Sequence, residues 1–281
     1  MNLSLTLSKR LVFFGCVTLV CFVITSFIVG FMTMKGGTDA RWLRIAAVVQ
    51  DVVLFILPAI VIAIFCTRLP ARFLTIDRFP RLRMSVMALC TLVVSIPAMN
   101  LLIQFNESIS LPSALSGVEE YMRQAEASAR SYTETLLSGD TVMSLIVSLL
   151  IVGVLAGFSE ELFFRGAFQR LLVTGRVNVH VAVWIVAVVF SAMHMQFYGF
   201  FPRMLLGAYF GYLAVWSGSL WLPVIIHAFN NCVYIVGQWH AAGAQPSVVD
   251  TVGTGGEVLM ACSSVVLTAL GISLIYRQRI R

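Results

Sequence analysis

Six polar side chains that lie in or beside three apolar stretches of the sequence could do chemistry together: Glu160, Glu161, Arg165, His194, His227 and Asn231. A charged side chain inside a bilayer costs about 2.5–3.5 kcal/mol on insertion scales, so such groups need a reason to be there. A carboxylate and an imidazole can activate a water molecule, and imidazole or amide N–H groups can stabilise an oxyanion. These are the parts needed to hydrolyse a peptide bond.

The two adjacent glutamates are expected to have different partners. Neighbouring residues on a helix point about 100° apart, whereas Glu161 and Arg165 are four residues apart, share a face and can pair. Glu160 is then left without a cationic partner on its own helix. A carboxyl in a low-dielectric site suits a general base that works near neutral pH. The competing interpretation is a charged cluster at a helix end, solvated by the cytoplasm.

The histidines extend the pattern to two further stretches. His227 and Asn231 are four residues apart on one helix face, and His194 follows Phe190 by one turn. A lone intramembrane histidine is more often a packing or hydrogen-bonding residue. With Glu160, the two histidines could instead hold a zinc ion with a water in its open position. The sequence has no HExxH motif, and the three residues are far apart along the chain.

The composition places these residues in a membrane protein. Of the 281 residues, 59% are hydrophobic and 11% are charged, whereas a soluble domain has about 25% charged residues. Apolar runs of about 20 residues predict spanning helices rather than a barrel. This excludes a soluble enzyme, a disordered regulator and a fibrous protein. The six cysteines show no CxxC spacing and are interpreted as small buried hydrophobic residues.

We therefore expect an all-α, polytopic integral membrane protein of about eight transmembrane helices with an intramembrane catalytic cavity. Asp51, in the second span, is expected to line a polar cavity or to pair with an arginine. The polar stretch 106–140 holds a candidate surface helix at 118–137 that would lie against the outer face. The predicted spans are residues 11–33, 43–66, 83–105, 141–163, 179–195, 202–217, 220–238 and 257–276.

The distribution of charge predicts that both termini are cytoplasmic. An even number of spans puts both ends on one side, and both ends are basic. The loops after the second and fourth spans are rich in arginine, whereas the 106–140 loop is acidic. The positive-inside rule assigns the basic loops to the cytoplasm. The net charge of +6 thus points to the lipid bilayer and not to a nucleic acid partner.

No internal repeat or long linker divides the chain, so one structural domain is expected. Within it, residues 1–140 would hold the first three helices and the polar extracytoplasmic loop at 106–140. Residues 141–240 would form the catalytic core, and residues 241–281 a C-terminal loop and the last helix.

The predicted spans leave one problem of depth. Glu160 and His227 fall near the cytoplasmic third of the membrane, whereas His194 lies deeper at about 1.5 Å per residue. A fourth helix that continues past Arg165 would bring them level, and so would a re-entrant segment near residues 195–202.

Three motifs in this part of the sequence resemble those of the CPBP intramembrane proteases. That family includes the type II CAAX prenyl endopeptidases and bacterial relatives such as the bacteriocin-processing-like proteins of the Abi family. EExxxR stands at residues 160–165, FxxxH at 190–194, and a stretch close to SLWxxIxxHxxxN at 219–231, with Val224 in place of isoleucine. EExxxR alone would be a weak signal. The three motifs in order, over about residues 141–235, form a specific one.

The resemblance implies an endopeptidase that cleaves a membrane-associated peptide or protein in the lipid bilayer, here the bacterial cytoplasmic (inner) membrane. It implies that Glu160 activates water with help from His194, and that His227 and Asn231 stabilise the oxyanion. This scheme needs no metal or other cofactor. Zinc bound by Glu160 and the two histidines is the alternative.

By the same resemblance, Glu161 and Arg165 are structural neighbours of the site. Two other classes of protein would use the same buried polar residues. A transporter or channel could relay protons through them, although that class often has inverted repeats and interrupted helices, which we do not find in the sequence. A non-catalytic immunity or scaffold protein would keep the fold for binding, yet none of the four candidate catalytic positions has been lost.

Overall fold

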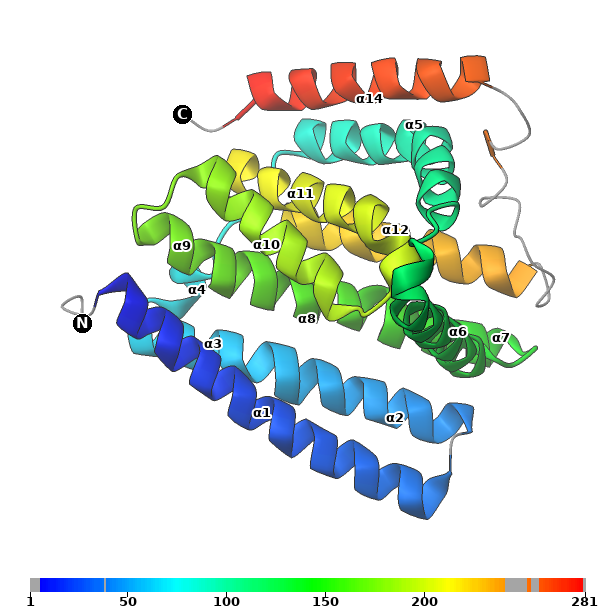
Figure 1. The fold of residues 1–281 in the computed structure, drawn as a ribbon. Coiled ribbons are helices and arrows are strands. Elements are labelled where there is room, and N and C mark those ends of the chain that lie inside the picture. Colours follow the sequence, from blue (N-terminus) through cyan, green and yellow to red (C-terminus); the bar gives the residue numbers. More distant parts are fainter. Residues whose placement is uncertain (1–5, 38, 241–251, 254–257, 280–281) are drawn as a thin grey trace.

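The computed structural model describes residues 6–37, 39–240, 252–253 and 258–279, and every regular element within them is helical (Figure 1). The predicted all-α class is confirmed. The α-helices are α1 (Leu7–Gly36), α2 (Ala40–Gln50), α3 (Leu57–Cys66), α4 (Pro70–Phe73), α5 (Leu82–Glu107), α6 (Ser116–Leu137), α7 (Val142–Ser148), α8 (Ala156–Glu161), α9 (Arg170–Thr174), α10 (Val179–Met193), α11 (Phe200–Ser217), α12 (Trp221–His240) and α14 (Val258–Arg277). Three π-helical segments, η1 (Asp51–Ile56), η3 (Leu149–Leu155) and η4 (Leu162–Gln169), and two 3₁₀ helices, η2 (Ser113–Leu115) and η5 (Phe197–Gly199), complete the elements.

Two of the spans are composite helices in which α-helical and π-helical segments alternate. The segments from α2 to α3 form one helix, Ala40–Cys66, and those from α7 to α9 form a helix of 33 residues, Val142–Thr174. The expected end of the fourth span at residue 163 is therefore wrong. The charge of Arg165 suggested a helix end, but its side chain is buried by other helices and the backbone continues past it.

Five helices in the described part of the chain are long and apolar enough to cross a membrane: Leu7–Gly36, Ala40–Cys66, Leu82–Glu107, Val142–Thr174 and Leu259–Arg277. The other three predicted spans are also helices. Of these, α10 is apolar but only 15 residues long, and α11 and α12 have 18 and 20 residues. Each predicted span thus corresponds to a helix, and the chain is a multi-pass membrane protein.

The outer surface of the bundle is apolar, as contact with lipid requires. On α1, large side chains such as Phe27 and Phe31 are 75% and 62% exposed. All six cysteines are free, in keeping with their interpretation as hydrophobic residues, although half of them face outward rather than inward.

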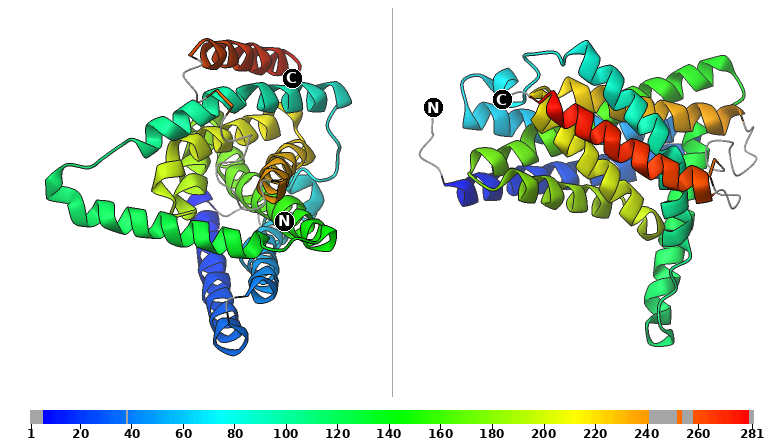
Figure 2. Two further views of the ribbon diagram at one scale, coloured as in Figure 1. Left: turned by 90° about the vertical axis from the view of Figure 1, so that its right-hand side faces the viewer. Right: turned by 90° about the horizontal axis from the view of Figure 1, so that it is seen from above.

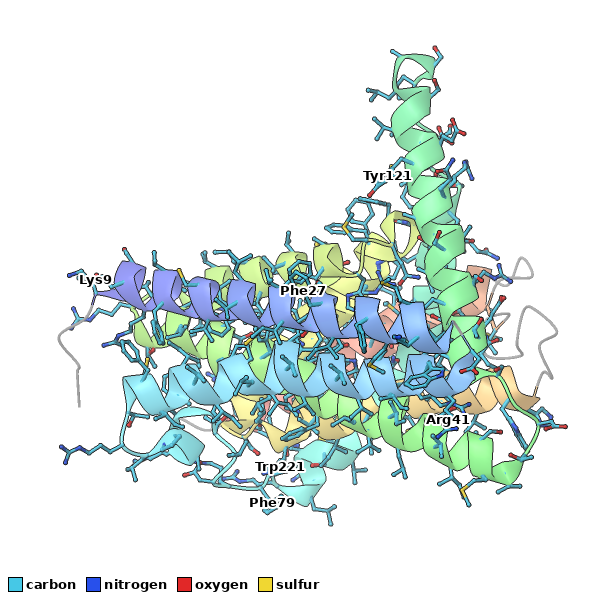
Figure 3. All side chains as sticks on the ribbon, turned by 90° about the horizontal axis from the view of Figure 1, so that it is seen from below. Lys9, Phe27, Arg41, Phe79, Tyr121 and Trp221 are labelled. Carbon is cyan, nitrogen blue, oxygen red and sulfur yellow. The ribbon has the colours of Figure 1, made fainter. Side chains whose placement is uncertain are left out.

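The helix α6 runs across one end of the bundle rather than along it (Figure 2). Its first turns project beyond the other helices, where Figure 3 labels Tyr121. It corresponds to the predicted surface helix at 118–137 and begins two residues earlier. At its other end, Arg44 of α2 donates hydrogen bonds to the carbonyls of Leu136 and Ser138, at 3.0 and 2.7 Å. A cation stabilises the end of a helix at which unpaired carbonyls gather.

Small residues let the central helices approach closely. A Cβ atom on Gly157 of α8 would lie 3.0 Å from the backbone nitrogen of Ala228 on α12. On α11, Gly207 and Gly211 are spaced as in the Gly-x-x-x-Gly pattern that marks close helix packing in membranes. Their carbonyls accept hydrogen bonds from Arg165 and Gln169, at 2.7 and 3.1 Å. These contacts bring α8, α11 and α12 together around the polar residues.

Candidate active site

A buried ion cluster joins the fourth span to α12. Glu161 Oε1 accepts hydrogen bonds from Arg165 Nη1 at 2.5 Å and from His227 Nδ1 at 2.8 Å. The side chains of Glu161 and Arg165 are fully buried, and that of His227 is 6% exposed. The predicted i,i+4 pair is present, and the interpretation as a solvated helix end is wrong. A buried charge is tolerated only with such partners, because its desolvation costs several kcal/mol.

Aromatic rings and a carbonyl complete the surroundings of Arg165. Its Nη2 donates to the carbonyl of Gly207 at 2.7 Å. Its guanidinium carbon lies 4.7 Å from the ring centroid of Phe190 and 5.5 Å from that of Phe210. Ring faces attract a cation, most strongly where water is excluded. Arg165 is thus held from three elements, and it fixes the position of Glu161 in turn.

The two glutamates approach opposite nitrogens of His227. Because a carboxylate can only accept, His227 Nδ1 carries the hydrogen that binds Glu161. His227 Nε2 lies 3.8 Å from Glu160 Oε2, which is too long for a hydrogen bond. Phe210 stacks on the imidazole at a centroid distance of 4.8 Å. Nε2 is therefore the nitrogen of His227 that is left for a reacting group.

His194 directly follows the last residue of α10 and lies beside the same cluster. Its Nδ1 lies 2.8 Å from the carbonyl oxygen of Phe190, so Nδ1 carries the hydrogen and Nε2 can accept one. The Phe190 ring stands edge-on to both imidazoles, with centroid distances of 5.0 Å to His194 and 5.9 Å to His227. Glu160 is within electrostatic reach of His194. The four-residue spacing from Phe190 to His194 thus serves to orient the imidazole.

The long fourth helix places Glu160 and His194 at similar distances from the ends of their helices. Glu160 lies 14 residues before Thr174, and His194 lies 15 residues after Val179. Glu160 is thus about 20 Å from the end of its helix at Thr174, and His194 is about 20 Å from the start of α10 at Val179, at about 1.5 Å per residue. The position of Glu160 relative to the cytoplasmic third of the membrane stays a prediction. Of the two solutions that the sequence left open, the continued helix is the one present.

Asn231 faces the fourth span from α12. Its Nδ2 donates to the carbonyl of Val152 in η3 at 3.2 Å. An amide nitrogen has two hydrogens, so one of them remains for another acceptor. Asn231 lies one turn beyond His227 on the same helix, and its contact with the fourth span is at Val152, eight residues before Glu160.

Asp51 enters the same region from the second span. Asp51 Oδ1 accepts a hydrogen bond from Ser159 Oγ at 2.9 Å, and both residues are buried. The expected pairing with an arginine is not found among the described residues. Ser159 precedes Glu160, so Asp51 supports the backbone that carries the candidate base. In the sequence, Asp51 could be singled out as an acid inside an apolar span. Phe210, which contacts His227 and Arg165, is itself apolar and could not be singled out in this way.

The zinc alternative requires a set of ligands that converge on one point. Within the residues that the structure describes, no three His, Cys, Asp or Glu side chains are placed to hold a metal ion. The hydrogen bonds of His227 Nδ1 to Glu161 and of His194 Nδ1 to the Phe190 carbonyl leave both Nε2 atoms available, as in many zinc-binding histidines. As arranged, however, the side chains do not converge on one point, and we derive no step through a metal.

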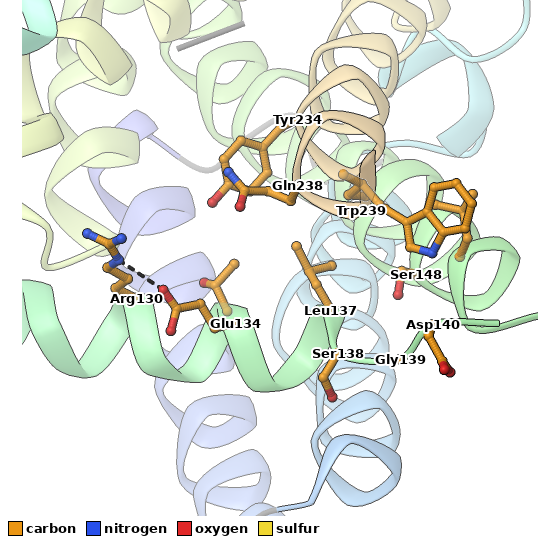
Figure 4. Close-up of a pocket in the computed structure, with 13 residues that line it drawn as sticks. Arg130, Glu134, Leu137, Ser138, Gly139, Asp140, Ser148, Tyr234, Gln238 and Trp239 are labelled. Atoms are coloured by element: carbon orange, nitrogen blue, oxygen red, sulfur yellow. Dashed lines mark hydrogen bonds and ion pairs between the residues drawn. The ribbon is translucent and has the colours of Figure 1, made fainter. Parts of the chain in front are cut away.

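A cavity of about 720 Å³ opens where α6, α7 and α12 meet, and none of the four candidate catalytic residues lines it (Figure 4). Its wall includes Ser148 and Ile235. These residues lie one helical turn from Val152 and Asn231, the pair joined by the hydrogen bond described above. The cavity thus approaches the site from the end of the bundle that α6 crosses.

Residues 142–233 match the family model of the type II CAAX prenyl endopeptidases, described as Rce1-like. The matched segment runs from the start of α7 into α12 and contains Glu160, His194, His227 and Asn231. The resemblance that three motifs indicated is therefore confirmed for this third of the chain, which is similar to the Rce1-like endopeptidases. The match supports a protease with a peptide or protein substrate. No curated protein and no solved structure matches the chain.

Proposed function

We propose that the protein is an intramembrane endopeptidase that hydrolyses a peptide bond of a membrane-associated peptide or protein. The observation that carries this proposal is that His194 and His227 both contact the ring of Phe190, while the Glu160 carboxylate lies 3.8 Å from His227 Nε2. The three residues come from separate elements of the segment that matches the protease family.

Glu160 removes a proton from the attacking water, which His194 orients through Nε2. The carboxylate of Glu160 has no hydrogen-bond donor among the described side chains, and its side chain is 17% exposed. It is thus available to a water molecule, unlike Glu161. Positioned general bases contribute about 10²–10⁴-fold to a rate. When the tetrahedral intermediate collapses, Glu160 returns the proton to the leaving amine.

His227 and Asn231 stabilise the oxyanion of that intermediate. Because His227 Nδ1 is engaged by Glu161, His227 can donate from Nε2 only when both nitrogens carry a proton. Glu161 and Glu160 lie on opposite sides of the ring, and Glu160 Oε2 is 3.8 Å from Nε2. Asn231 supplies the amide hydrogen that Val152 does not use. Loss of one oxyanion donor costs about 10²–10³-fold in turnover.

The test is cleavage of a panel of membrane-tethered peptides by the purified full chain in lipid nanodiscs. We expect His194→Ala to lower turnover about a hundredfold, since the water loses its second contact. The matched control is His180→Ala, at the start of the same helix, where the imidazole contacts only the Tyr212 hydroxyl among the residues described. Undiminished cleavage by His194→Ala would overturn the proposed pair.

A chelator arm of the same assay addresses the alternative mechanism. We expect wild-type cleavage to be insensitive to the chelator 1,10-phenanthroline. Inhibition that added zinc reverses would instead favour the set Glu160, His194 and His227 as metal ligands.

The proposal also places the protein in the bacterial cytoplasmic (inner) membrane with both termini in the cytoplasm. In support, the described ends of the chain lie at the same end of the bundle (Figure 1), and the arginine-rich stretch 68–83 follows the second span. A green fluorescent protein fused after Arg281 is expected to fluoresce in cells. Activity of alkaline phosphatase fused at the same site would contradict this orientation, because that enzyme matures only outside the cytoplasm.

A further inference from the structure

The turn that follows His194 has an unusual backbone. Met195 has a φ of 54°, in the left-handed region that residues other than glycine rarely adopt. The chain then forms the short helix η5 before α11 begins. Such a conformation persists only where the surroundings enforce it. The contacts of this turn therefore bear on the position of His194.

Gln196 connects the turn to two helices. Its side-chain oxygen accepts from Arg203 Nη2 at 2.7 Å, and its carbonyl accepts from Arg203 Nη1 at 3.4 Å. Its amide nitrogen donates to Glu126 Oε1 of α6 at 3.4 Å. A chain of hydrogen bonds thus runs from α6, through the residue two positions after His194, to α11.

Two further contacts hold the same turn. Arg123 of α6 lies over the ring of Tyr198, with 5.2 Å between the guanidinium carbon and the ring centroid. Asn106, which is buried near the end of α5, donates to the carbonyl of Phe197 at 3.0 Å. The segment 106–126 thus fixes η5 although it lies outside the part of the chain that matches the protease family.

Glu126 also acts on Arg203 through its negative charge. The guanidinium is within electrostatic reach of Glu126, of Glu160 and of His194. Glu126 Oε2 is buried and has no hydrogen-bond partner among the described residues. Without Glu126, only Glu160 of these two carboxylates would still attract Arg203. The turn would then be drawn toward Glu160, the candidate base.

We propose that α6 sets the position of His194, with Glu126 and Arg203 as positioning residues that act through Gln196. The catalytic consequence rests on the proposed function, in which His194 orients the attacking water. The helix α6 lies at the end of the bundle and is exposed along much of its length (Figure 3). A solvent-exposed element thereby controls a group inside the membrane-embedded site.

The test compares three variants of the full chain in lipid nanodiscs. Glu126→Ala removes the acceptor, and Glu126→Gln keeps an oxygen that can accept from Gln196. The matched control is Glu120→Ala, an exposed acid of the same helix whose hydrogen bond, with Gln124, stays within α6. The first measurement is hydrogen exchange of the backbone amides of residues 194–199, which needs no substrate.

We expect Glu126→Ala to speed this exchange about tenfold and to lower kcat about tenfold at unchanged KM. A displacement of about 1 Å in a reacting group can cost up to about a hundredfold. Glu126→Gln, which keeps the acceptor but loses the charge, is expected to restore the exchange rate in part, and Glu120→Ala to match the wild type throughout. Exchange in Glu126→Ala that equals that in Glu120→Ala would overturn the inference, whatever the activity.

A second arm separates this inference from the proposed function. In a His194→Ala background, adding Glu126→Ala is expected to lower the residual turnover no further, because groups that act through one another are not additive. An equal additional loss in that background would overturn the inference. If His194→Ala alone leaves turnover unchanged, the proposed function fails, and the exchange measurement still decides whether α6 holds the turn.

Discussion

Glu160→Gln is expected to lower cleavage of the membrane-tethered peptides about 10³-fold. Glutamine has nearly the same shape as glutamate but cannot take a proton from water, and a positioned general base contributes about 10²–10⁴-fold. The carboxylate of Glu160 belongs to no hydrogen bond among the described side chains, and its Oε2 lies 3.8 Å from His227 Nε2. The variant therefore loses the proton acceptor but no structural contact. The measurement is kcat at saturating substrate.

Two controls make this result specific to the chemistry. The thermal unfolding midpoint of Glu160→Gln should equal that of the wild type, whereas a lower midpoint would assign the loss of activity to the fold. Glu120→Gln, which neutralises an exposed acid of α6, should cleave at the wild-type rate. Wild-type turnover by Glu160→Gln would mean that another group is the base, and His227 Nε2 would be the first to test.

Arg165→Met is expected to lower the free energy of unfolding by about 3–5 kcal/mol. Removal of one partner of a buried ion pair leaves the other charge buried without compensation. Here that charge is Glu161, whose side chain is fully buried beside Arg165. Methionine fills a similar volume without the charge, so the loss reports the electrostatics more than the packing. The measurement is unfolding in mixed detergent micelles by titration with sodium dodecyl sulfate.

The matched control is Arg130→Met, because Arg130 and Glu134 also form an i,i+4 pair, in the opposite order, on α6 with side chains 60% and 55% exposed. Exposed pairs of this spacing contribute about 0.3–0.5 kcal/mol. Adding Glu161→Gln to Arg165→Met should restore part of the lost stability, since no isolated charge remains. Equal effects of Arg165→Met and Arg130→Met would contradict the account of the cluster.

Contacts within one helix were predictable from the sequence. The pairing of Glu161 with Arg165 depends only on a spacing of four residues, and it is present. The spans follow from apolar runs in the same way, because hydrophobic length is a local property. The surface helix in the 106–140 stretch was also predictable from its polarity and amphipathic pattern.

Contacts between helices were not predictable from the sequence. The end of the fourth span was misplaced because the burial of Arg165 depends on Gly207 and Phe210, more than 40 residues away. The same holds for the two carboxylates that flank His227, since their approach needs the close packing at Gly157. No periodicity in the chain indicated that Gln196 would reach α6. Such pairings arise only once the helices have been assembled.

The 33-residue helix that carries Glu160 has a consequence for what can be cleaved. Along the helix axis, Glu160 lies about 27 Å from the start of this helix and about 21 Å from its end, so a hydrocarbon layer about 30 Å thick that is centred on the helix would enclose it. A polypeptide at that depth normally hides its carbonyls in its own helical hydrogen bonds. A scissile bond must therefore be unwound before water can attack it. Depth alone would select substrates with glycine, proline or other poor helix formers at the cleavage point.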